Sequence, residues 1–205
     1  MNRGELEILV GEYLHRTDTD TIGAIPGFIT LTTARIGRDL RSQENQTILD
    51  PFQPAAEISA LPVDYRQIKS LSYLSGRIRI DVITATAGVL ATYPRTGNSP
   101  QVYNVIGKSI EIAPFSPIDM RLIYFNAPAE LVDTDSENEI LTAYPYIYLY
   151  GALIEGFTFT QDGGGRDTVL ATFGEEVELI NKQTINADTG ARPRSLSTRR
   201  RHYAT

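Results

Sequence analysis

The hydrophobic periodicity of this chain changes twice, and this change limits the folds open to it more than any other feature. Residues 3–15 place apolar side chains at the spacing of one helix face. From residue 42 the apolar runs become short, and 77–82 alternates charged with apolar side chains, as a half-buried strand does. The helical spacing returns near the C-terminus. The sequence therefore predicts a fold of the α+β class.

The helical spacing predicts two helices at each end of the chain. The second helix is expected to have Pro26 in its first turn, where the missing N–H of proline would be unsatisfied anyway. The third follows Ser136 and Glu139, which have the spacing of a capping box. The fourth follows the breaker 162–165. The expected ranges are 3–15, 26–41, 140–160 and 166–183.

Short runs bounded by proline and glycine predict a sheet in the middle of the chain. The last three runs follow one another at the spacing of an antiparallel meander. The expected strands are 47–49, 57–61, 67–74, 77–82, 101–106, 109–113 and 120–125, with a short helix at 84–92.

These elements predict a specific arrangement within the α+β class. We expect the N- and C-terminal helix pairs to form one helical bundle, with the strands as an inserted antiparallel β domain and an extended C-terminal arm. The expected segments are 1–41 and 136–185 for the bundle, 42–135 for the β domain and 186–205 for the arm.

The charge of the chain is divided unevenly between its body and its C-terminus. Residues 187–205 contain one acid, Asp188, which leaves 24 acidic and 14 basic residues in 1–186. The body therefore carries a net charge of −10 and repels nucleic acid at long range, so only the arm attracts polyanions. The basic residues of the arm are Arg192, Arg194, Arg199, Arg200 and Arg201.

No combination of side chains in the sequence indicates catalysis. The absence of cysteine excludes thiol nucleophiles, disulfides and cysteine ligands for zinc. The two histidines, His15 and His202, belong to no spaced ligand pair and to no plausible triad. We therefore expect no enzyme activity, no cofactor and no metal site. If the protein is an enzyme after all, the alternative is a small carbohydrate-active enzyme with carboxylate chemistry.

Three motifs resemble functional sites only superficially. The alternating acids of 133–139 have Asn138 where a calcium-binding loop needs glycine, so a capped helix start is favoured. The glutamates of 175–178 point in different directions on a helix, which indicates a solvated face. The sequence 163–166 lacks the Lys-Ser/Thr of a phosphate-binding loop, so we expect a turn between helices.

The apolar segment 140–160 is long enough to suggest a membrane span. Pro145, several hydroxyl-bearing side chains and the single charge of Glu155 favour a helix buried in protein instead, and no membrane partner is expected. Because an unpaired buried carboxylate is costly, Glu155 is expected to pair with Arg35 or Arg38.

The same segment contains a row of tyrosines. Each offers apolar area with one polar tip, which suits contacts between subunits, although packing inside the subunit is the expected role for most of them. The four are Tyr144, Tyr146, Tyr148 and Tyr150.

Several segments, taken in order, resemble the phage head-to-tail adaptor family of connector and head-completion proteins, of the type called tail tubular protein A in short-tailed phages. The resemblance covers residues 3–184, and Gly88 with its neighbouring threonines departs from the family's usual helix. The segments that carry it are Phe28-Ile29, 34–41, 61–65, 68–71, 103–107, 110–114, 122–125 and 144–153.

The resemblance implies a structural protein of the virion. Proteins of that family form a homo-oligomeric ring between the portal at the capsid vertex and the tail or nozzle protein. On this resemblance the ring is expected to be a dodecamer, with DNA passing through its bore without sequence-specific binding. Such a ring is assembled in the host cytoplasm and ends in the neck of the virion. On this resemblance the arginines of the arm are expected to bind an acidic groove on the portal or on a neighbouring subunit. Another neck or tail-completion protein is the structural alternative.

Overall fold

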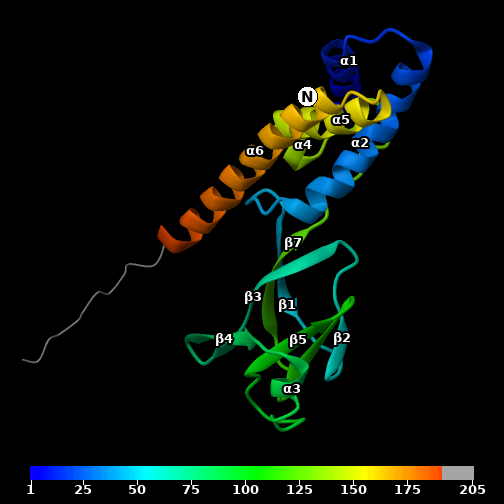
Figure 1. Cartoon of the computed structure of the whole chain (residues 1–205). Helices are drawn as coiled ribbons and strands as arrows, with labels where there is room; N and C mark the ends of the chain where they lie inside the picture. The colour runs from blue at the N-terminus through cyan, green and yellow to red at the C-terminus, as the bar shows by residue number, and fades with distance from the viewer. Residues whose placement is uncertain (191–205) are drawn as a thin grey trace, which may run out of the picture.

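The N- and C-terminal helices lie at one end of the molecule and the strands at the other in the computed structural model, which describes residues 1–190 and the side chains of 1–187 (Figure 1). The N-terminal helices are α1 (Arg3–Leu14) and α2 (Thr19–Asp39). Asn2 caps α1 in a capping box with Glu5, and Asp18 caps α2. Since α2 begins at Thr19, the expectation that Pro26 marks its first turn is wrong, and Pro26 lies inside the helix.

The C-terminal helices are α4 (Glu139–Ala143), α5 (Pro145–Phe159) and α6 (Gly163–Gly190). The expected single helix over 140–160 is broken at Tyr144, because the residue before a proline is disfavoured in the helical conformation and Pro145 takes the first position of α5. The cap of α4 is Asn138 and not Ser136, whose hydroxyl accepts the backbone N–H of Asp133. None of the helices within 1–190 combines the length and the apolar character needed to cross a membrane.

The strands form one seven-stranded sheet in the order β1-β7-β3-β4-β5-β6-β2. Neighbouring strands are antiparallel except β4 and β5, which run parallel. The short helix α3 (Ala87–Leu90) makes the connection between those two. The strands are β1 (Gln46–Phe52), β2 (Ile58–Ala60), β3 (Tyr65–Ser75), β4 (Ile78–Thr84), β5 (Val102–Ile106), β6 (Ser109–Ala113) and β7 (Met120–Asn126).

The predicted fold is right in its α+β class but wrong in its arrangement. The strands do not form an antiparallel domain inserted into a bundle of helix pairs; they form a curled half-barrel that contains a parallel pair. The expected meander fails at β7, which pairs with β3 and β1 and not with β6. The buried side chains of Leu122 and Tyr124 explain this position, because both lie in the apolar cluster that these strands share. The segment boundaries at 42 and 135 remain a prediction.

The last helix is longer than predicted. We expected it to end near residue 183 and an arm to begin at 186, but α6 continues to Gly190. Val177, Ile180 and Thr184 are buried along it, so its packed face extends past the last apolar residue of the predicted stripe. The remainder of the predicted arm, 191–205, lies outside the described residues.

The helix α5 lies between α1, α2 and α6 and is packed most closely at its glycines. A Cβ atom at Gly151 would overlap the side chain of Thr32 in α2. A Cβ atom at Gly156 would lie 2.8 Å from Cδ1 of Leu14 in α1. Thr32 is fully buried, and its hydroxyl donates to the carbonyl of Phe28 at 2.8 Å, which fixes its side chain. The helix axes can therefore approach this closely only because glycine occupies these two positions.

This packing predicts that Gly151→Ala destabilises the protein. The added methyl group has no space beside Thr32, so we expect the free energy of unfolding to fall by about 1–3 kcal/mol. Urea denaturation followed by circular dichroism measures the change. Gly174→Ala in α6 is the matched control, because its Cβ atom would meet nothing within 4 Å, and it should leave stability unchanged or raise it. Equal effects of the two substitutions would contradict the close packing.

Candidate subunit-contact surfaces

The tyrosine row of α5 is divided between the core and the surface. Successive tyrosines are two residues apart, so they point to different sides of the helix. Tyr148 is fully buried and its hydroxyl accepts a hydrogen bond from the side-chain amide of Asn138 at 2.7 Å. Tyr146 is 62 % exposed, and its ring stacks on that of Tyr150 with centroids 6.2 Å apart. Tyr146 is therefore the one tyrosine of this row that is exposed at the surface, and Tyr150 is half-buried beside it.

The first tyrosine of the row, Tyr144, makes a hydrogen bond to a residue far away in the sequence. Its hydroxyl donates to Oε2 of Glu44 at 2.9 Å. Burial raises the pKa of Tyr144 to about 12, and the hydrogen bond and the charge of Glu44 act in the same direction. The neutral tyrosine is therefore favoured in the folded state.

The raised pKa of Tyr144 predicts a loss of stability in alkali. The pKa of a tyrosine in the unfolded chain is about 10. The stabilisation linked to the raised pKa is therefore complete below that pH and is lost as the pH rises through the folded pKa of about 12. Urea denaturation between pH 8 and pH 12 should show a steeper fall for the natural chain than for Tyr144→Phe. Parallel curves for the two proteins would contradict the assignment.

The single charge of α5 is paired, as the sequence predicted. Nη2 of Arg35 donates to Oε1 of Glu155, which confirms Arg35 as the partner. The side chains are 25 % and 18 % exposed, so the pair is partly screened by water. Arg38 instead pairs with its neighbour Asp39, at 2.7 Å between Nε and Oδ1. The pair between Arg35 and Glu155 thus connects α2 to α5.

Removing one partner of this pair should cost more than removing both. Arg35→Met leaves the partly buried carboxylate of Glu155 without a cation, and we expect a loss of about 1–3 kcal/mol in unfolding free energy. The double variant Arg35→Met with Glu155→Gln should recover part of that loss. A double-mutant cycle in urea measures the coupling. A coupling near zero would show that the pair contributes nothing to stability.

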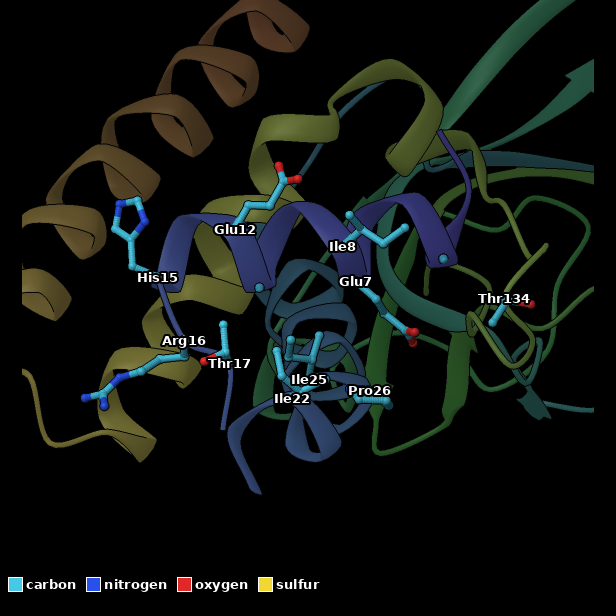
Figure 2. Close-up of a pocket in the computed structure, with 12 residues that line it drawn as sticks. Glu7, Ile8, Glu12, His15, Arg16, Thr17, Ile22, Ile25, Pro26 and Thr134 are labelled. Carbon is cyan, nitrogen blue, oxygen red and sulfur yellow. The ribbon is translucent and has the colours of Figure 1, made fainter. Parts of the chain in front are cut away.

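An apolar groove between α1 and α2 was not predicted from the sequence (Figure 2). Its cavity volume is about 680 Å³. Ile8 comes from α1 and Ile22 from α2, and both are exposed. The sequence carried a weak signal for it, since Ile8 falls outside the buried face formed by Leu6 and Val10. Glu7, Gly11, Glu12, His15, Arg16, Ile25 and Pro26 also line the groove.

The remaining motifs of the sequence have local structural roles. The expectation that 163–166 forms a turn between helices is wrong, because these glycines form the first turn of α6, where the N–H of Gly165 donates to Oδ1 of Asp162 at 3.0 Å. Glu178 pairs with Lys182 along the same helix at 2.6 Å. The arginines expected to bind the portal all lie outside the described residues, at positions 192, 194, 199, 200 and 201.

Two of the surfaces described so far are typical of contacts between proteins. They are the exposed Tyr146 with the half-buried Tyr150 stacked on it, and the apolar groove. The comparison with family models agrees with a role in such contacts: the model described as SU10 adaptor protein matches residues 1–200. The chain therefore belongs to the SU10 adaptor protein family, a family of phage head-to-tail adaptors. The comparison with curated proteins found no match.

Family membership confirms the resemblance and sets the general role. The chain is a structural adaptor protein of a phage, and the family is not known for enzymatic activity. Its place is in the neck of the virion. An adaptor in that place associates with portal and tail proteins.

Proposed function

We propose that the chain forms a homo-oligomeric ring, a dodecamer, between the portal and the tail or nozzle protein, and that DNA passes through its bore. The observation that carries this proposal is the family match over residues 1–200. Assembly takes place in the host cytoplasm, and the ring is held at the portal of the capsid.

The charge of the body supports passage of DNA without retention. Residues 1–186 carry 24 acidic and 14 basic side chains. Several of the basic side chains are engaged inside the subunit, among them Arg3 with Glu7 at 2.8 Å. A wall with few free cations offers a sliding duplex little to bind, because affinity for DNA grows with each phosphate neutralised by lysine or arginine.

The arginine-rich segment 191–205 is proposed to attach the ring to the portal. Its five arginines stand against no acid in that segment. Guanidinium groups bind carboxylates in bidentate pairs, so an acidic groove of the portal is a suitable partner. The exposed Tyr146 and the half-buried Tyr150 that stacks on it are proposed to contact a neighbouring subunit.

Electron microscopy of capsids that carry the portal but lack this protein tests both proposals. Adding the full chain should place a ring of twelve copies on the portal, and the same reconstruction gives the copy number and the subunit contacts. The chain shortened by residues 191–205 should fold as before, because the apolar clusters of the described core are all formed by residues before 181, but should fail to dock. Attachment of the full chain should also weaken steeply with added salt.

The outcomes separate the parts of the proposal. Docking of the shortened chain would reject the arm as the portal anchor while leaving the ring intact. A single copy per vertex, or no binding by the full chain, would reject the ring adaptor itself.

A further inference from the structure

The strand β4 lies inside the sheet order, yet along most of its length no other described strand covers its second edge. β4 pairs with β3 along 78–82, but its pairing with β5 is limited to Ile83 and Thr84. The N–H of Ile83 donates to Gln101 on the β5 side, and in a strand alternate residues direct their backbone groups to the same side. The N–H and C=O groups of Arg79 and Asp81 therefore point away from β3 and meet no strand among the described residues.

One face of this uncovered edge is apolar and accessible, and the other bears Arg77, Arg79 and Asp81. The hairpin of β3 and β4 projects from the side of the sheet (Figure 1). Ile78 is 69 % exposed, and Ile80 is 37 % exposed on the same face. The stretch 77–83 contains no proline, the residue that commonly protects an edge strand. An edge of this kind is a template for pairing with another strand.

A second edge of matching length lies on the other side of the same strands. β1 is the terminal strand, and it pairs only with β7. Pro51 ends its capacity for regular pairing, which leaves the stretch 46–50. Ile48 and Leu49 in this stretch are both exposed. Backbone groups alternate in direction along each strand, and the pairings from β4 through β3 and β7 to β1 fix which residues of β1 face β7. By this pattern the N–H and C=O groups of Ile48 point away from β7.

We propose that the β4 edge of one copy pairs with the β1 edge of the next copy, so that the sheet continues from subunit to subunit. This inference rests on the proposed ring and names its interface. The strands β1, β7, β3 and β4 alternate in direction, so a copy added in the same orientation brings β1 antiparallel to β4. The two edges differ, and such a head-to-tail contact generates a closed ring when the rotation between copies closes.

One register of this pairing matches backbone groups, apolar side chains and charges together. Placing Arg79 opposite Ile48 joins outward-facing backbone groups in a hydrogen-bonded pair. Ile78 then faces Leu49, and both lie on the face of the sheet that bears the buried Leu71. In the same register the exposed Arg77 lies opposite Asp50. The Asp50 carboxylate lies 3.8 Å from Arg121 and is still about half exposed.

The absence of cysteine in the chain permits a direct test by disulfide cross-linking. Ile78 and Leu49 would form a non-hydrogen-bonded pair with Cα atoms about 4.5 Å apart, which a disulfide can span. Within one copy β1 and β4 are three strand spacings apart, about 14 Å, which it cannot span. Oxidation of the full-length double variant I78C/L49C, bound to portal-bearing capsids, should therefore give a ladder of covalent multimers that collapses on reduction.

Three controls define the result. I78C alone and L49C alone should give no ladder, because a head-to-tail interface does not bring identical residues together. L74C with L49C should also give none, since Leu74 is exposed on the same hairpin but opposite Arg79, on the other face. Rings that are visible by electron microscopy but give no ladder with I78C/L49C would overturn this interface and leave the ring adaptor standing. Absence of rings for the natural chain would reject the proposed function and this inference with it.

Discussion

The close approach of α5 to α1 and α2 is the constraint on which the helical end of the molecule depends. Two glycines make it geometrically feasible, and the neighbouring positions of α5 are filled by side chains that are almost completely buried. The polar groups on the packed side of such a helix have little access to water, so each needs a partner in the protein. Tyr148 finds Asn138, and Glu155 finds Arg35. The packing and the polar contacts of α5 therefore depend on each other.

The connection between the helices and the sheet depends on α6 as much as on α2. The side-chain oxygen of Asn181 accepts the backbone N–H of Arg41 at 2.6 Å, and its amide donates to the carbonyl of Asp39 at 3.1 Å. One residue of α6 thus satisfies backbone groups at the C-terminal end of α2, where the helix leaves them unpaired. Arg41 also lies over the ring of Phe125 in β7, with 5.7 Å between its Cζ atom and the ring centroid. The short segment after α2 is therefore fixed by α6 on one side and by β7 on the other.

The sequence predicted local structure well and long-range pairing poorly. Each expected strand overlaps an observed one, because alternation and the surrounding prolines and glycines act over a few residues. The position of β7 beside β1 and β3 was missed, since no local pattern records which distant strand buries Leu122. The break at Tyr144 was missed for a different reason: a strongly apolar run concealed the effect of Pro145. The pairing of Glu155 was predictable because the cost of a buried charge leaves few alternatives.

The candidate surfaces show the same contrast between local features, which the sequence predicts, and long-range contacts, which it does not. The tyrosine row was visible in the sequence, but which of its members are exposed depends on the direction from which α1, α2 and α6 pack against α5. The open edge of β4 could not be predicted, because the alternation of 77–82 describes an edge strand and a paired strand equally well. Its exposure arises because β5 begins beside Ile83 and so pairs only with the last two residues of β4. The described subunit is therefore closed where its helices pack and has uncovered strand edges at β1, at β2 and along part of β4, and an edge of this kind is a template for pairing with another chain.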